Sequence, residues 1–307
     1  MISRRNIRVK VMQTLYSIDS MEKDIKPGQE IRMLRDHFDQ TRQLLAYLIY
    51  FITEVARYVE KDARNRASKH LPTAEDLNIN IKLAGNELVW KIREDGSFLK
   101  CLKEDKLELL LDKELVRKIY QQLAETPEYG RYIHEQGRDK KAEKEIIEFI
   151  YNDLLLPSEL FISHIEELFP NWEDDCEMVH KLLLNYFARP GSFDFQELLS
   201  GEKWNYAKEL LQCVLNKSEV AKELISPKLN NWDAERIASL DMILMEMGVC
   251  EFLFFDTIPP KVTINEYIDL AKEYSTPQSG HFVNGILDNI HKELVSGNKM
   301  HKTNFKK

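Results

Sequence analysis

Glycine and proline are scarce in this chain. It has only 11 glycines and 10 prolines among 307 residues, below the usual shares of about 7% and 5%. Because these two residues supply many tight turns, their scarcity favours long, uninterrupted secondary-structure elements. The composition therefore argues against an all-β sandwich.

Long apolar runs are also missing. The longest, Leu44 to Ile52, has nine residues, whereas a helix needs about 20 to span a bilayer. The basic N-terminal segment, Met1 to Arg8, is not followed by the apolar stretch and small-residue cleavage site of a secretory signal. We therefore expect a protein without membrane segments that stays in the cytoplasm.

The sequence offers little to support a metal site or an enzyme. No C-x-x-C pair links the cysteines, so we expect reduced thiols. There is no phosphate-binding glycine loop, no H-E-x-x-H and no G-x-S-x-G. Glu177 and His180 have the spacing of half a di-iron site, but only Asp288 and His291 approach the second half. We expect no enzyme activity, no metal and no cofactor. The cysteines are Cys101, Cys176, Cys213 and Cys250.

Helical periodicity is the dominant pattern. Apolar residues recur at i, i+3, i+4 and i+7 almost throughout, and no alternating strand pattern of useful length competes. The expected fold class is therefore all-α. Helices are expected at residues 31–59, 105–125, 140–155, 158–169, 172–188, 203–216, 218–225, 233–254, 264–274 and 279–295.

Charge is distributed unevenly along the chain. The 43 basic and 51 acidic residues give a net charge of −8, yet both ends are basic and contain no acid. Such asymmetry indicates an anionic partner at one place. By themselves, the C-terminal lysines are typical of a solvated tail. The basic residues are Arg4, Arg5, Arg8 and Lys10 at one end and Lys299, Lys302, Lys306 and Lys307 at the other.

The opening helix breaks a local rule. Ser3 is a suitable N-cap, and apolar residues around most of the helix predict that it belongs to the core. Arg4, Arg5 and Arg8 lie in its first two turns, where each cation opposes the helix dipole by roughly 0.3–1 kcal/mol. Two explanations remain open. The guanidinium groups contact phosphates and bases, or they form structural ion pairs with the acidic body.

The last two expected helices carry start signals. Thr263 and Glu266 have the spacing of a capping box, and Ser279 can cap the helix that follows. Gly285, inside that helix, suggests close helix contact because glycine costs about 1 kcal/mol relative to alanine there. These packing features name no function.

Three blocks of residues occur in a fixed order, at residues 4–16, 232–251 and 260–288. Together they resemble the NusB family of bacterial transcription antitermination factors. The residues that carry the pattern are Arg4, Arg5, Arg8, Gln13, Leu15 and Tyr16; Trp232, Asp233, Glu235, Arg236, Ile237, Asp241, Ile243, Leu244 and Glu251; and Pro260, Val262, Ile264, Asn265, Glu266, Leu270, Ala271, Lys272, Ser279, Phe282, Val283, Asn284, Gly285, Leu287 and Asp288.

The resemblance implies an all-helical, non-enzymatic, RNA-binding transcription antitermination factor. Members of the family bind the boxA element of ribosomal RNA leaders together with NusE, the small-subunit ribosomal protein, and help RNA polymerase read through terminators. The implied partners are therefore single-stranded boxA-like RNA, NusE and the RNA polymerase antitermination complex. The implied RNA-binding residues are Arg4, Arg5, Arg8, Gln13, Tyr16, Ser279, His281, Phe282 and Asn284.

The sequence departs from the family pattern at three points. His281 stands where the family has Lys, and His is the weaker cation at pH 7. Met245 stands where Arg is common. Residues from about 20 to 200 separate the opening block from the later ones, and we interpret them as an additional helical domain or, in part, as a completion of the bundle.

The expected organisation has four parts: residues 1–20 as the first helix of a NusB-like bundle, 21–138 as an additional helical region, 139–295 as the C-terminal bundle, and 296–307 as a basic tail. The alternative function is an adaptor whose acidic body docks a basic ribosomal protein without sequence-selective RNA binding. The arginines discriminate between the two. Exposure beside Tyr16 and the turn near Ser279 favours RNA binding, whereas pairing with acids favours the adaptor.

Overall fold

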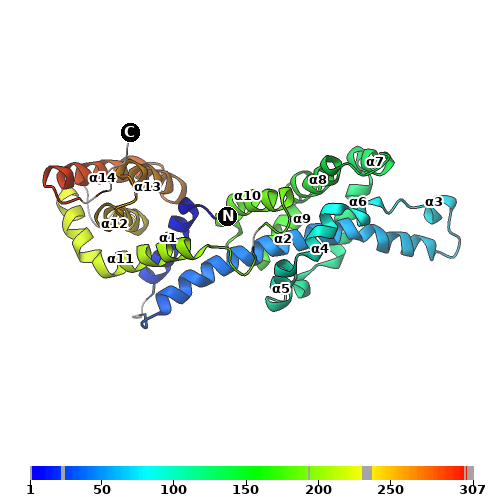
Figure 1. The fold of residues 1–307 in the computed structure, drawn as a ribbon, viewed down its shortest axis with the longest axis horizontal. Coiled ribbons are helices and arrows are strands. Elements are labelled where there is room, and N and C mark those ends of the chain that lie inside the picture. The colour runs from blue at the N-terminus through cyan, green and yellow to red at the C-terminus, as the bar shows by residue number, and fades with distance from the viewer. Residues whose placement is uncertain (1, 22–24, 193, 230–236, 301, 303–307) are drawn as a thin grey trace. The chain divides into compact units, whose positions relative to one another are not determined.

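The computed structural model describes residues 2–21, 25–192, 194–229, 237–300 and 302. Within these ranges all regular secondary structure is helical (Figure 1), which confirms the all-α fold class. No helix in them combines the length and the hydropathy needed to cross a bilayer. Part of the second sequence block, from Trp232 to Arg236, lies outside the described residues, as do Lys306 and Lys307 of the basic tail.

The chain divides into two compact units. Unit 1 comprises Phe38–Leu198, and unit 2 comprises Ile2–His37 together with Leu199–Lys307. The N-terminal helix therefore belongs to the same unit as the C-terminal helices, whereas residues 139–198 belong to unit 1. The four-part domain organisation stays a prediction.

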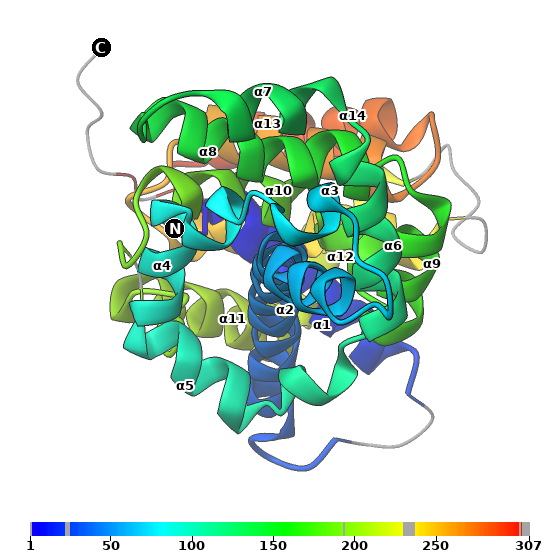
Figure 2. The ribbon, with the colours of Figure 1, turned by 90° about the vertical axis from the view of Figure 1, so that its right-hand side faces the viewer.

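Unit 1 is organised along helix α2 (Gln29–Ala67), whose first turns belong to unit 2. Its aromatic side chains reach two other helices, with Phe51 4.9 Å from Phe161 and Tyr58 5.3 Å from Tyr120 between ring centroids. α7 and α8 lie side by side (Figures 1 and 2). The other α-helices of unit 1 are α3 (Ala74–Leu77), α4 (Glu87–Glu94), α5 (Gly96–Glu104), α6 (Lys113–Ala124), α7 (Pro127–His134), α8 (Lys140–Phe149, continued by a π-helical segment at Ile150–Leu155), α9 (Glu159–Leu168) and α10 (Trp172–Ala188).

Unit 2 is a bundle around α12. This helix contacts α1, α11, α13 and α14, and every residue from Ile243 to Phe252 is buried, as expected for a helix that is apolar on nearly all sides. Ser3 caps α1 as predicted, because its side chain accepts a hydrogen bond from the Asn6 amide. The helices are α1 (Arg4–Asp19), α11 (Gly201–Ile225), α12 (Ser239–Phe254), α13 (Pro260–Tyr274) and α14 (Ser279–Ser296).

A buried ion pair joins α1 to α12 inside this bundle. Arg8 Nε lies 2.7 Å from Glu251 Oε1, and Arg8 Nη2 lies 3.1 Å from Glu251 Oε2. The two side chains are 2% and 0% exposed. Three hydroxyl groups also donate to the Glu251 carboxylate, from Tyr206 at 2.7 Å, Thr263 at 2.8 Å and Tyr267 at 3.0 Å. One carboxylate therefore holds side chains of α1, α11 and α13.

The surroundings raise the pKa of three members of this cluster, Arg8, Tyr206 and Tyr267. Burial raises the pKa of Tyr206 and of Tyr267 well above the ordinary value, and the Glu251 charge adds to the effect, so both hydroxyls remain donors at neutral pH. Burial opposes the charge of Arg8, but Tyr267 and Glu251 outweigh it and the pKa of Arg8 is raised. Glu266 gives Arg8 a second carboxylate at 3.3 Å.

The predicted caps of the last two helices are wrong. α13 begins at Pro260, and the Thr263 hydroxyl donates to Glu251 instead of capping the helix. α14 begins with Ser279 itself, and the Ser279 hydroxyl donates to Asp241 Oδ2 at 2.7 Å. Both side chains serve tertiary contacts with α12, which local spacing does not reveal.

The basic tail is also not wholly solvated. Lys302 Nζ donates to the backbone oxygens of Glu251 and Phe255, both at 2.7 Å. These carbonyls belong to the last turn of α12 and its cap, where no helical amide is available to them. The Lys302 ammonium group therefore supplies hydrogen bonds to carbonyl groups at the C-terminal end of α12. For this lysine, the prediction of a solvated tail is wrong.

The glycine that permits close helix packing is Gly248, not Gly285. A Cβ atom on Gly248 would lie 2.9 Å from the buried Leu287 side chain, whereas one on Gly285 would meet nothing within 4 Å. We expect Gly248→Ala to lower the free energy of unfolding by about 1–3 kcal/mol through overpacking, measured by urea denaturation. Gly285→Ala is the matched control and should raise it by about 0.5–1 kcal/mol. Equal stabilities of the two variants would contradict this packing.

Removal of Arg8 should destabilise the protein strongly. In Arg8→Ala the Glu251 carboxylate stays buried without its cation, so we expect a loss of about 3–5 kcal/mol in the free energy of unfolding. Arg4→Ala is the matched control. Arg4 is half exposed and lies 3.5 Å from the exposed Glu202, so its loss should change stability by less than about 1 kcal/mol. A small effect of both substitutions would show that the buried pair does not hold α1.

Candidate nucleic-acid interface

The nine predicted RNA-binding residues divide by burial. Arg8, Ser279 and Phe282 are 2%, 2% and 8% exposed, so each lies inside unit 2. The Arg8 and Ser279 side chains are engaged with Glu251 and Asp241. These contacts give both residues structural roles that need no RNA. The accessible or partly accessible members are Arg4, Arg5, Gln13, Tyr16, His281 and Asn284.

α1 and α13 run antiparallel where they touch. Arg5 lies 2.7 Å from Glu273, whereas Arg8, one turn later on α1, lies 3.3 Å from Glu266, two turns earlier on α13. The first turn of α1 therefore meets the C-terminal end of α13, which is followed at once by the turn to α14 (Figure 1). This arrangement brings Arg5 to the same end of α13 as that turn.

The turn from α13 to α14 is held by hydroxyl groups. The Ser279 hydroxyl lies 2.8 Å from that of Thr276 and 3.0 Å from that of Ser275, in addition to its bond to Asp241. Exposed His281 follows directly in α14. The sequence block that the family resemblance singled out therefore forms a fixed corner of unit 2.

Lys272 is a cation of this corner that belongs to the family pattern but was not among the predicted RNA-binding residues. Its aliphatic stem crosses the start of α14, because a Cβ atom on Gly280 would lie only 2.6 Å from Lys272 Cγ. Its ammonium group lies 3.9 Å from Asp269. The signal was present in the sequence, because Asp269, Lys272 and Glu273 have the i, i+3 and i+4 spacing of one helix face.

Tyr16 does not belong to this corner. It is 47% exposed but lies eleven residues after Arg5 on α1, or about 16 Å along the helix axis. Because α1 and α13 are antiparallel, this displacement leads away from the turn before α14. The structure therefore separates Tyr16 from His281 and Asn284, and the predicted residues do not form one cluster.

All three arginines of α1 have acidic partners. Arg4 lies 3.5 Å from Glu202, Arg5 2.7 Å from Glu273, and Arg8 2.7 Å from Glu251. Burial opposes the charge of Arg5, but the hydrogen bond that Arg5 donates to Glu273 and the charges of the nearby carboxylates together outweigh it, so the pKa of Arg5 is raised. The ion-pair explanation for the arginines therefore describes the observed contacts, and Arg4 and Arg5 keep partial access to solvent.

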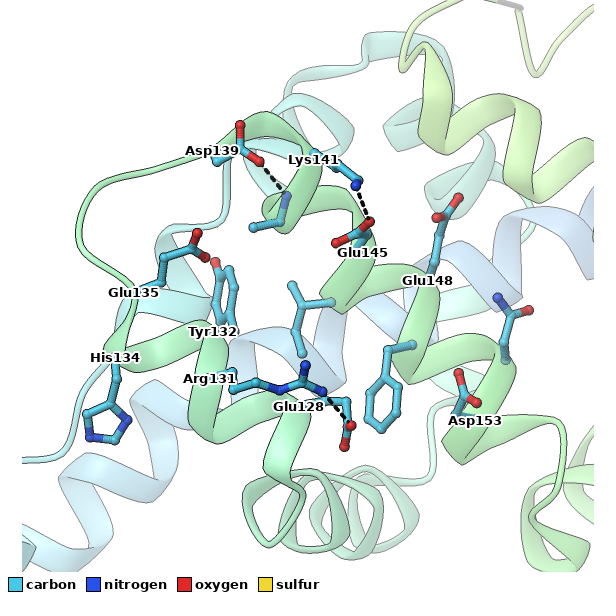
Figure 3. Close-up of a pocket in the computed structure, with 14 residues that line it drawn as sticks. Glu128, Arg131, Tyr132, His134, Glu135, Asp139, Lys141, Glu145, Glu148 and Asp153 are labelled. Atoms are coloured by element: carbon cyan, nitrogen blue, oxygen red, sulfur yellow. Dashed lines mark hydrogen bonds and ion pairs between the residues drawn. The ribbon is translucent and has the colours of Figure 1, made fainter.

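Unit 1 contains a cavity of about 930 Å³ between α7 and α8. Figure 3 shows Arg131 paired with Glu128 and Lys141 paired with Glu145 along its walls. Carboxylates outnumber Lys and Arg in the lining, and none of the nine predicted residues takes part. In the described ranges, no group of three or more His, Cys, Asp or Glu side chains is placed to hold a metal ion. The acidic lining residues are Glu128, Glu135, Asp139, Glu145, Glu148 and Asp153.

Several known proteins are similar to part of this chain. The NusB family model matches residues 169–292. The transcription antitermination protein NusB of Salinibacter ruber is 41% identical over 99 residues, which are 32% of this chain and 62% of that protein. The protein of the same name from Chloroherpeton thalassium is 39% identical over 95 residues, 31% of this chain and 45% of that protein. The chain thus spans less than two thirds of these two relatives.

Two further similarities cover more of the known protein. The transcription antitermination protein NusB of Methylacidiphilum infernorum is 38% identical over 107 residues, which are 35% of this chain and 73% of that protein. The solved structure of T. maritima NusB is 31% identical and aligns with 40% of this chain and 82% of its own length, with a TM-score of 0.31. By its sequence similarity over most of the M. infernorum relative, the chain belongs to the NusB family.

Proposed function

We propose that this chain is a transcription antitermination factor that binds single-stranded boxA-like RNA of ribosomal RNA leaders, together with NusE, within the RNA polymerase antitermination complex. The observation that carries the proposal is the match of the NusB family model to residues 169–292. These residues include α11 to α13 and most of α14, helices that form most of unit 2. The proposed role is binding, without an enzymatic step.

The accessible residues of α1 and of the first turns of α14 are the proposed RNA contacts. Arg4 and Arg5 supply guanidinium groups that suit phosphate oxygens. His281 and Asn284 are exposed on the first turns of α14. Exposed Tyr16 offers a ring on which a base could stack, at a separate point of α1. Arg8, Ser279 and Phe282 then contribute by holding this surface in place.

A second candidate function is an adaptor that docks a basic ribosomal protein. Two observations favour it. Each of the α1 arginines is paired with an acid, and the cavity between α7 and α8 has a predominantly acidic lining. Acidic surfaces of this kind accelerate encounter with a basic partner more than they fix its affinity.

Salt-dependent RNA binding separates the two functions. We expect the protein to bind a boxA-like single strand more tightly than a scrambled strand, and more tightly still when NusE is present, as measured by fluorescence anisotropy at several salt concentrations. Arg4→Ala should weaken binding and reduce the slope of log affinity against log salt by about 0.7 per lost phosphate contact.

The matched control for this variant is Arg117→Ala. Arg117 is an exposed arginine of α6, paired with Glu114, so its removal changes the net charge equally but in unit 1, which holds none of the proposed contacts. We expect Arg117→Ala to bind RNA like the unaltered protein. NusE binding without any preference between the two RNA strands would support the adaptor and contradict the RNA-binding proposal.

A further inference from the structure

Arg5 lies beside two carboxylates of α13 on the surface of unit 2. Arg5 Nη2 lies 2.7 Å from Glu273 Oε2, and Arg5 Nη1 lies 3.8 Å from Asp269 Oδ2. The carboxylates are spaced i, i+4, so they lie on one face of the helix. All three side chains are partly exposed, at 35%, 43% and 55%. The contact is therefore an ion pair that solvent and other anions can reach.

The Asp269 carboxylate lies between two cations. Its Oδ2 atom faces Arg5, and its Oδ1 atom lies 3.9 Å from Lys272 Nζ. Both distances are longer than a hydrogen-bonded ion pair, so Asp269 is held loosely. An oxygen anion between a guanidinium and an ammonium group is the arrangement that a backbone phosphate would adopt on the same two side chains.

At the other two arginines of α1, a phosphate would not exchange with a carboxylate in this way. Arg8 is enclosed with Glu251 at 2% exposure, so a phosphate cannot reach it without disruption of the core. Arg4 is 48% exposed, lies 3.5 Å from Glu202, whose side chain is 84% exposed, and lies 5.6 Å from the centroid of the Tyr206 ring, so it has no close ion pair to give up. Arg5 is intermediate between the buried Arg8 and the exposed Arg4, because it forms a close ion pair that solvent can reach.

We propose that Glu273 and Asp269 are internal competitors of RNA. In this arrangement a phosphate group binds between Arg5 and Lys272 only when it displaces the two carboxylates, which occupy the same donors in the free protein. The charge of α13 thereby sets the RNA affinity of the corner formed by α1, α13 and α14. This inference rests on the proposed RNA-binding function and adds both a further phosphate contact, Lys272, and a device that limits affinity.

Neutralisation of the competitor should strengthen RNA binding. Glu273→Gln keeps the size of the side chain but removes its charge, so Arg5 becomes available to phosphate. We expect the affinity for boxA-like single-stranded RNA to rise about two- to fivefold, the range set by the strength of partly exposed ion pairs. The slope of log affinity against log salt should steepen by about 0.7 for the added phosphate contact. Fluorescence anisotropy at several salt concentrations measures both.

Two further variants identify the source of the gain. Glu219→Gln removes the same charge from α11, where Glu219 is 90% exposed and faces Lys222 at 4.0 Å, and we expect unchanged RNA affinity. Arg5→Ala in the Glu273→Gln background should abolish the gain, because the carboxylate acts through Arg5. Circular dichroism and thermal unfolding of each variant verify that the fold is retained.

The outcomes separate the inference from the function on which it rests. If the unaltered protein binds RNA and Glu273→Gln binds it equally well, the inference is wrong and the RNA-binding function stands. Equal gains from Glu273→Gln and Glu219→Gln would also overturn the inference, because only net charge would then matter. If neither the unaltered protein nor Glu273→Gln binds RNA, both the inference and the proposed function fail.

Discussion

The buried ion pair between Arg8 and Glu251 is the interaction on which unit 2 depends. The two residues are 243 positions apart in the chain, yet the pair fastens the N-terminal helix to the centre of a bundle built from C-terminal helices. Hydroxyl groups from α11 and α13 complete the shell of Glu251. A buried charge is tolerated only when it is paired and fully hydrogen-bonded, so this cluster specifies one arrangement of four helices.

The same pair restricts what the N-terminal arginines can do for RNA. A guanidinium that stabilises the core is unavailable to a ligand, so Arg8 contributes only by holding α1 in place. Arg4 and Arg5 remain accessible but face acids of α11 and α13. The corner that the family resemblance points to is therefore less basic than the arginine cluster in the sequence indicates. In the proposed function RNA competes with these local acids, so their neutralisation or displacement would control affinity.

The family match and the compact units do not coincide along the chain. The match begins at residue 169, so it includes α10, which belongs to unit 1. There the Thr41 hydroxyl donates to Asp175 at 2.6 Å and joins α10 to α2. A helix that the family shares is thus packed against a helix from the long intervening region. Unit 1 also has an acidic cavity, where the proposed adaptor would dock its basic partner.

The sequence by itself determined the features that arise from local interactions. Helical periodicity predicted the all-α class and the bounds of α10 at residues 172 and 188, and Ser3 capped α1 as expected, because these depend on neighbours within one or two turns. Local spacing predicted two helices where α11 is continuous. It also misassigned Thr263 and Ser279 as caps, and it placed at Gly285 the close helix contact that belongs to Gly248. Tertiary structure alone decided the partners of these residues and of the arginines, since each partner lies on another helix and burial determines which charges stay available to a ligand.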